Sequence, residues 1–378
     1  MADTTFRVVL TGGGSGGHIY PLLSVADALR ARAGKMSFEL SLAYLGPNDS
    51  NAALVKKAGI AVHSIVAGKI RRYLSLSNIV DIPKFFIGFF QALAKLYVIM
   101  PDVIFSKGGT GAFPVVLAGW FYRIPIVIHD SDAKPGLTNL ASSFFAKRIF
   151  ISFDAAAKYF NPAITVRSGV PVRAALFANP TTKELAKEAL GFDAAKSLVL
   201  VIGGSQGSEK INNFILENLA PMLRETQILH QTGAANFAEV KRLSEAALLE
   251  APFANRYQVV AYFDDINLAL ALTAADLAVA RAGSSTLFEF AAFGVPSVLV
   301  PHEGSNSHQR MNAYDFSENG AAIVIEEANL LPGIFVSQMK SVLANPELRK
   351  KMSDAAKKYF MPNAAETIVD GILDAVVK

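Results

Sequence analysis

Two glycine-rich turns, each following a short apolar run, most strongly constrain what this chain can fold into. Residues 6–10 lead into the glycine-rich stretch 11–17, and the apolar run 198–202 leads into Gly203-Gly204-Ser205-Gln206-Gly207. A helix-spaced pattern follows each turn. In such a strand, turn and helix unit, the N–H groups of the turn and the positive end of the helix attract phosphate. The sequence therefore predicts two α/β halves that each open on a phosphate-binding turn.

The rest of the chain continues the alternation of short apolar segments and helical stretches. Strands are predicted at 38–45, 61–66, 103–105, 126–129 and 148–151 in the first half, and at 228–230, 258–261, 277–280, 297–300 and 321–325 in the second. This alternation is typical of parallel sheets in the α/β fold class.

The chain of 378 residues is longer than a single hydrophobic core usually serves. We predict an N-terminal domain at residues 1–167 and a C-terminal domain at residues 168–362. The last segment, 363–378, has the spacing of an amphipathic helix. We expect it to pack back on the first domain.

Composition excludes several classes of function. The 36 basic and 32 acidic residues give a net charge of +4, too small for a nucleic-acid-binding surface but compatible with phosphate-bearing ligands or anionic lipid. Without cysteine there is no disulfide, thiolate nucleophile or cysteine-ligated zinc. The first residues lack the pattern of a signal peptide, and apolar stretches such as 113–129 are interrupted by Arg123 and Pro125. We expect neither secretion nor a transmembrane helix.

Residues 71–100 depart from the alternation because they mix basic and aromatic side chains. The aromatic residues are Phe85, Phe86, Phe89 and Phe90. This composition is typical of a segment at a membrane interface. We predict a patch that docks on an anionic membrane surface; the alternative is a core helix whose lysines extend to solvent.

The first glycine turn fits a dinucleotide-binding spacing, but its context argues against a nicotinamide enzyme. The second predicted strand ends in Tyr44-Leu45-Gly46, without the acidic residue that would hold a ribose. His18 follows the turn directly, where a reacting hydroxyl could reach its imidazole. His18 is therefore a candidate general base, although a histidine that only caps the turn or donates to phosphate would stand at the same place.

Two further motifs place small polar residues after a predicted strand. Ser106-Lys107-Gly108-Gly109-Thr110-Gly111 could supply more phosphate donors, or could form only a turn. Arg281-Ala282-Gly283-Ser284-Ser285-Thr286 opens another helix whose N-terminus would face phosphate. Glu289 lies about one and a half helical turns beyond Ser284, far enough to reach a ribose hydroxyl. Without the preceding glycine, Glu289 would be expected to be a solvated surface acid.

Seven segments occur in the order found in one enzyme family: residues 12–21, 129–139, 169–173, 203–207, 230–233, 281–289 and 308–313. The chain resembles the MurG family, the peptidoglycan N-acetylglucosaminyltransferases of glycosyltransferase family 28. The resemblance implies the GT-B fold, two Rossmann-like parallel-sheet domains facing across a cleft. It also implies inverting transfer of N-acetylglucosamine from UDP-N-acetylglucosamine to a lipid-linked N-acetylmuramoyl-pentapeptide. Such a protein would act peripherally at the cytoplasmic face of the cell membrane, without a metal or cofactor.

The resemblance also implies roles for single residues. Donor contacts are implied for Ser15, Gly16, Gly17, Asp132, Arg173, Ser205, Phe263, Ser284, Ser285, Thr286, Leu287, Phe288, Glu289 and Gln309. Contacts to the acceptor pyrophosphate are implied for Gly13, Gly14, Gly108, Gly109 and Thr110. His18 is the candidate catalytic base, with Asp130 and Asp132 as rivals. Asp132 stands where the family usually has asparagine, and because a carboxylate cannot donate hydrogen bonds, donor-sugar selectivity depends on this position.

Three alternatives remain open from the sequence. A related transferase could use another lipid acceptor on the same frame, and a UDP-N-acetylglucosamine epimerase can share both the frame and the UDP site. An epimerase needs no lipid contact, so residues 71–100 argue against it. The third alternative is a binding protein without activity. Against it stands the joint presence of Ser15, His18, Arg173, Glu289 and Gln309.

Overall fold

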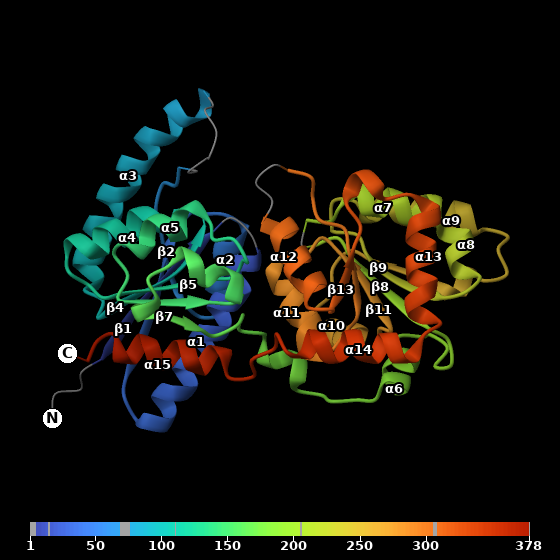
Figure 1. Ribbon diagram of the computed structural model, residues 1–378. Helices are drawn as coiled ribbons and strands as arrows, with labels where there is room; N and C mark the ends of the chain where they lie inside the picture. The colour runs from blue at the N-terminus through green and yellow to red at the C-terminus, as the bar shows by residue number, and fades with distance from the viewer. Residues whose placement is uncertain are drawn as a thin grey trace. The chain divides into compact units, whose positions relative to one another are not determined.

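The computed structural model describes residues 5–13, 16–68, 76–109, 111–204, 206–304 and 308–377. The chain divides into two compact units, each built on one parallel sheet (Figure 1). Unit 1 comprises Met1–Val172 and Met361–Lys378, and unit 2 comprises Arg173–Phe360. The predicted α/β fold class with two parallel sheets is confirmed.

Unit 1 contains a seven-stranded sheet in the order β3-β2-β1-β4-β5-β6-β7. Its strands are β1 (Phe6–Gly13), β2 (Leu40–Gly46), β3 (Ala61–Ser64), β4 (Val103–Gly109), β5 (Ile126–Asp130), β6 (Arg148–Ile151) and β7 (Thr165–Arg167). Its helices are α1 (Gly16–Met36), α2 (Ser50–Lys57), α3 (Leu76–Ile99), α4 (Ala112–Phe121), α5 (Leu137–Ser143) and α15 (Ala364–Asp374), with the 3-10 helices η1 (Asp154–Tyr159) and η2 (Pro162–Ile164).

The apolar strands of unit 1 are explained by helices on both faces of its sheet. Val8 and Leu10 pack with α1 and α15 on one face, whereas Val9 packs with α3 and α4 on the other. Successive side chains of a strand point to opposite faces, so a sheet covered on both sides needs a continuous apolar run rather than alternation.

Helix α15 brings the chain back to unit 1. Its Ile368, Val369 and Ile372 are buried in a core shared with α1 and β1. The division between the units lies at Val172 and Arg173, a few residues after the expected boundary at 167 and 168. The reason is that the N–H groups of Ser168 and Gly169 both donate to the carbonyl oxygen of Ile151, which keeps this segment beside β6.

Helix α3 carries most of the basic, aromatic segment; residues 71–75 of that segment lie outside the described residues. Phe86 and Phe90 are 53% and 65% exposed. Phe85 and Phe89 are only half-buried, and Phe85 stacks on Phe113 of α4. In Figure 1 the first turns of α3 extend beyond α4 and α5. The helix therefore combines one packed side with one exposed apolar side.

The stretch Asp81–Ile99 of α3 is long and apolar enough to cross a membrane, judged by length and composition alone. It is the one such stretch among the described helices. Only two lysines and one aspartate interrupt its apolar composition. Length and composition do not show that the stretch crosses a membrane, so the expectation of no transmembrane helix stays a prediction.

Unit 2 contains a six-stranded sheet in the order β10-β9-β8-β11-β12-β13. Its strands are β8 (Leu198–Ile202), β9 (Gln227–Gln231), β10 (Tyr257–Val260), β11 (Leu277–Ala280), β12 (Ser297–Leu299) and β13 (Ala322–Val324). Its helices are α6 (Lys183–Ala189), α7 (Glu209–Glu217), α8 (Leu219–Leu223), α9 (Phe237–Leu248), α10 (Asp265–Ala274), α11 (Ser284–Phe293), α12 (His308–Glu318), α13 (Pro332–Leu343) and α14 (Pro346–Lys357), with the 3-10 helices η3 (Ala174–Phe177), η4 (Ala254–Arg256) and η5 (Glu327–Asn329).

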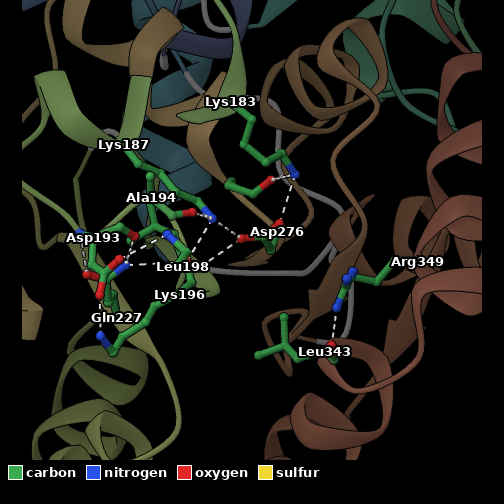
Figure 2. Close-up of polar contacts among 12 residues, drawn as sticks. Lys183, Lys187, Asp193, Ala194, Lys196, Leu198, Gln227, Asp276, Leu343 and Arg349 are labelled. Carbon is green, nitrogen blue, oxygen red and sulfur yellow. Dashed lines mark hydrogen bonds and ion pairs between the residues drawn. The ribbon is translucent and has the colours of Figure 1, made fainter. Parts of the chain in front are cut away.

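An ionic cluster around the buried Asp276 joins the amino-terminal ends of β8 and β11 (Figure 2). The Asp276 carboxylate pairs with the ammonium groups of Lys183 at 2.9 Å and Lys187 at 2.8 Å. It also accepts a hydrogen bond from the N–H of Leu198 at 2.9 Å. Burial raises the pKa of Asp276, but the two lysines and this N–H outweigh burial and lower it. Because open parallel sheets bind ligands at the opposite, carboxyl-terminal edge, we interpret this cluster as structural.

Candidate functional site

Each sheet contains one point at which the strand order reverses. It lies between β1 and β4 in unit 1, and between β8 and β11 in unit 2. Open parallel sheets bind ligands beyond the carboxyl ends of the strands at such points, because the loops there separate. Both predicted glycine turns follow these strands, one after β1 and one after β8. The topology therefore sets the turns after β4 and β11 beside them.

In unit 1 the turns after β1 and β4 contact each other through glycines. Gly13 is opposite Gly109 in the strand register. A Cβ added at Gly109 would overlap the carbonyl oxygen of Gly13 and lie 3.1 Å from the His18 imidazole. Gly109 also has a φ of +82°, which other residues rarely adopt. The structure thus brings Gly13, His18 and Gly109 together, with Gly16 and Gly17 in the first turn of α1.

Four of the predicted site residues lie outside the described residues. They are Gly14, Ser15, Thr110 and Ser205.

Asp130, a rival candidate for the base, holds the loop that follows β5. It is 2% exposed, and its carboxylate oxygens accept from the N–H of Asp132 at 2.9 Å and from Nδ2 of Asn139 at 2.8 Å. Burial and the nearby Asp132 raise the pKa of Asp130. Asn139 lies in turn against Gly108, where a Cβ would collide with its amide. Asp130 therefore fixes this loop, and His18, Asp130 and Asp132 stay predicted candidates for the base.

His129 ties β5 to the segment that leads out of unit 1. Its Nε2 lies 2.9 Å from the carbonyl oxygen of Gly169 and 3.2 Å from Oγ of Ser152. Because a carbonyl can only accept, Nε2 carries a proton. Nδ1 is buried without a hydrogen-bond partner among the described residues. Burial lowers the pKa of His129 well below its usual value, so this histidine is neutral and structural.

In unit 2 the first glycine turn packs against the turn after β9. Gly207 has a φ of +81°, and a Cβ there would overlap the carbonyl oxygen of Thr232. Gly233 has a φ of +84°, and a Cβ there would lie 2.6 Å from the carbonyl oxygen of Gln206. Both positions therefore require glycine, and the two turns form one compact edge.

Gln231, at the end of β9, links this edge to Phe263. Its Nε2 donates to the carbonyl oxygen of Gly204 at 3.4 Å, and its Oε1 accepts from the N–H of Phe263 at 3.1 Å. Phe263 itself is 4% exposed. Its ring is therefore buried, and its N–H is taken by Gln231.

Helix α11 begins directly behind β11 with small residues. Ala282 has a φ of +60°, a strained conformation for a residue other than glycine, and Gly283 precedes the helix without a side chain to cap it. Ser284 is 8% exposed, and Ser285 and Thr286 are half-buried. This helix start suits a phosphate.

Leu287 and Phe288 do not share this exposure. Both side chains are fully buried on the inner face of α11, and the N–H of Leu287 donates to the carbonyl oxygen of Gly283. Their side chains belong to the core, so the donor contact implied for these two residues stays a prediction that only their main chain could meet.

Glu289 pairs with Arg173 inside unit 2. Oε1 of Glu289 accepts from Arg173 at 2.9 Å, and Arg173 also donates to Asp265. Burial raises the pKa of Glu289, partly offset by Arg173. Burial would lower the pKa of Arg173, but the two carboxylates outweigh it and raise it. Sequence reasoning missed Asp265; the signal was the doubled aspartate before an apolar helix, in which Asp264 caps α10 and leaves the next carboxylate free for Arg173.

Arg281 is a second residue without a predicted role. Its guanidinium donates to Oγ of Ser208 at 2.8 Å, to the carbonyl oxygen of Val300 at 3.2 Å and to Glu327 at 2.5 Å. Arg281 therefore holds the loops after β8, β11 and β12 in fixed relation. Gln309, in the first turn of α12, is half-buried and its Oε1 accepts from the N–H of His302 at 3.3 Å.

The described ranges contain no group of three or more His, Asp or Glu side chains placed to hold a metal ion.

Comparisons with known proteins match both halves of the chain. Residues 8–151 match the glycosyltransferase family 28 N-terminal domain, and residues 198–368 match the C-terminal domain of the same family. A relative from Bacillus cereus, named UDP-N-acetylglucosamine--N-acetylmuramyl-(pentapeptide) pyrophosphoryl-undecaprenol N-acetylglucosamine transferase 2, is 34% identical over 372 residues, 98% of this chain and 99% of the relative.

Solved structures agree with these matches. The crystal structure of MurG from Acinetobacter baumannii is 26% identical with a TM-score of 0.74, covering 98% of this chain and 99% of that one. A UDP-GlcNAc 2-epimerase from Neisseria meningitidis reaches a TM-score of 0.67 at 14% identity, covering 98% of this chain and all of that one, and therefore shares the fold alone. Over both halves and nearly the full length, the chain belongs to glycosyltransferase family 28.

Proposed function

We propose that this protein transfers N-acetylglucosamine from UDP-N-acetylglucosamine to a lipid-linked N-acetylmuramoyl-pentapeptide, with inversion at the anomeric carbon. One observation carries the proposal: glycine turns lie at both reversal points, in a chain that matches a transferase of this name over nearly its full length. The epimerase alternative has only the shared fold in its favour.

Unit 2 supplies the donor side in this proposal. The N–H groups of the turn 203–207 and of the start of α11 suit the diphosphate of UDP, since both lie at the carboxyl edge of the sheet. Glu289 suits the ribose, because Oε2 of its carboxylate remains for hydroxyl donors when Oε1 pairs with Arg173. The cation at Arg173 and the helix start favour the negative charge that develops on the departing UDP.

Unit 1 supplies the acceptor side. The glycines after β1 and β4 let these two turns pack against each other beside His18, and the N–H groups of such turns suit a diphosphate. The acceptor hydroxyl oxygen attacks the anomeric carbon, the bond from that carbon to the diphosphate oxygen breaks, and UDP leaves with the electron pair. The hydroxyl proton passes to His18, whose imidazole lies at Gly109.

The apolar side of α3 supports a peripheral position on an anionic membrane, at the cytoplasmic face where a nucleotide sugar is available. Phe86 and Phe90 would enter the lipid interface, with Lys84 beside them at 45% side-chain exposure. Phe86→Asp with Phe90→Asp should abolish co-sedimentation with anionic vesicles. Leu249→Asp, at an 84% exposed leucine of unit 2, is the matched control. Unchanged binding of the double variant would contradict docking through α3.

The reaction is tested by UDP release from UDP-N-acetylglucosamine, with and without a prenyl-pyrophosphoryl muramoyl-pentapeptide acceptor. Release only with acceptor supports transfer, whereas conversion of the donor sugar without acceptor would support an epimerase. Transfer to a different lipid-linked sugar alone would support a related transferase.

His18→Ala tests the base. Loss of a general base lowers kcat on the order of 10²- to 10⁴-fold, with the donor KM little changed. His63→Ala, a histidine on β3 away from the reversal point, is the control. Equal losses in kcat and in donor affinity for His18→Ala would point to a binding role instead.

A further inference from the structure

Lys107 is the last residue before the glycines of β4, and it is 1% exposed. Lysine is almost never buried so completely unless a partner compensates its charge. Its stem packs on the first phosphate turn, since a Cβ added at Gly12 would lie 3.1 Å from the Cβ of Lys107. Burial lowers the pKa of Lys107 to about 8, although Asp130 and Asp132 act in the opposite direction. Burying this ammonium therefore costs folding free energy, and the reaction proposed above gives Lys107 no role.

The ammonium of Lys107 reaches the loop that follows the neighbouring strand. It donates to Oγ of Ser131, which is itself buried, and the carboxylates on either side, Asp130 and Asp132, face it electrostatically. Asp130 is already fixed by Asn139 and by the N–H of Asp132. Lys107 thus connects the glycine turn after β1, through its stem, with the loop 130–132, through its ammonium.

The charges around this loop show what the ammonium balances. The buried Asp130 ends β5, and the half-buried Asp132 stands two positions further on, where its charge raises the pKa of Asp130. Among the described residues, the neutral His129 on β5 faces both Lys107 and His18 of α1 electrostatically. Lys107 is a buried cation that attracts both carboxylates, so its loss would remove this attraction.

We propose that Lys107 is a positioning residue for the transfer reaction: with Ser131 it holds the loop 130–132, and with it Asp132, in place beside the first glycine turn. This inference rests on the proposed function, because Asp132 matters only if the sugar is transferred here. Lys107 itself does not touch a substrate, since it is buried.

The test compares Lys107→Met and Ser131→Ala with two matched controls. Lys158→Met removes an exposed lysine that lies over Tyr159, and Ser143→Ala removes a hydroxyl that donates to the carbonyl oxygen of Leu140 in its own helix. Each variant is assayed for kcat and KM over pH, and for amide hydrogen exchange of the segment 130–136. Exchange reports the loop directly, whether or not the protein is active.

We expect Lys107→Met to lower kcat on the order of 10- to 100-fold, the scale of a small misplacement of a reacting group. The acid limb of kcat/KM should move to higher pH, because loss of a cation favours the protonated form of nearby carboxylates. Amides 130–136 should exchange faster, and both controls should match the wild type. If Lys107→Met does not fold, Ser131→Ala carries the test, with a smaller change in the same direction.

Wild-type exchange of the loop in both test variants would overturn the inference, whatever the activity. So would an unchanged acid limb together with an unchanged kcat. If the wild type releases no UDP with acceptor, the proposed function fails, and the exchange comparison still decides whether Lys107 positions the loop.

Discussion

Acid should destabilise the donor side of unit 2 through one buried histidine, His230. This residue of β9 is 0% exposed, and its ring lies between the hydroxyl of Tyr257 at 2.9 Å from Nδ1 and Oδ1 of Asn212 at 3.0 Å from Nε2. Nδ2 of Asn212 donates to the carbonyl oxygen of Thr232, so Nε2 must donate to its Oδ1 and Nδ1 must accept from Tyr257. The network is complete only with a neutral ring.

Burial lowers the pKa of His230 to about 3 from an ordinary value of 6.5. The folded state therefore binds fewer protons than the unfolded state between these values, so this contribution to stability is fully present above pH 6.5 and is lost as the pH falls toward 3. Moving from pH 8 to pH 5 protonates the unfolded ring but not the folded one. The expected loss from His230 is about 2 kcal/mol.

The assay is urea unfolding followed by circular dichroism at pH 8 and pH 5, for the wild type and His230→Gln. The variant has lower stability at pH 8, but its decrease between the two values should be smaller than that of the wild type by about 2 kcal/mol. His308→Gln, on α12 of the same unit, is the control for the loss of a histidine from unit 2. An equal decrease in wild type and His230→Gln would refute the reasoning, as would an imidazole NMR signal of His230 that titrates near pH 6.

Three further outcomes follow from the geometry. Glu289→Gln should raise the donor KM on the order of 10-fold or more, because a neutral amide accepts hydrogen bonds from ribose hydroxyls less strongly than a carboxylate and leaves the charge of Arg173 poorly compensated. Isothermal titration with UDP measures the affinity, and an unchanged affinity would contradict the ribose role. Gly109→Ala should lower unfolding stability by about 1–2 kcal/mol or more and depress kcat, measured by urea unfolding and UDP release, because a Cβ there overlaps a carbonyl at a positive φ. Asp276→Asn should cost about 3–5 kcal/mol by leaving Lys187 buried without its carboxylate, yet leave the donor KM unchanged in whatever fraction folds; a changed KM would contradict its structural role.

The strands and turns of the carboxyl edges could be predicted from local pattern. At Gly109, Gly207 and Gly233 a Cβ would collide with a neighbouring turn, and φ is positive. A glycine that follows an apolar run is the sequence pattern that predicts such a position. The parallel direction of the strands could likewise be predicted, from the alternation of short apolar segments and helical stretches along the chain. The three-residue strand β7 was missed because an edge strand of that length has no period to read.

Roles that depend on a distant partner could not be read from the sequence. Arg173 and Glu289 are 116 positions apart, and Asp265 joins them only after α10 and α11 have packed in the same unit. Leu287 and Phe288 stood in the right motif but on the inner face of α11, which only the packing reveals. Lys107 was visible in its motif, but its burial depends on the turn and the loop of two neighbouring strands.

The return of the chain to unit 1 has a consequence for the order of folding during synthesis. Unit 2 is one continuous segment, Arg173–Phe360, whereas unit 1 is interrupted by it and receives Ile368, Val369 and Ile372 of α15 into its core. Domains generally fold as units when their chain is available. The ribosome therefore releases everything unit 2 needs before the last core helix of unit 1 exists, so the half that begins first must wait longest to be completed. Until then, the α1 surface that α15 covers stays open to chaperones and to misassociation.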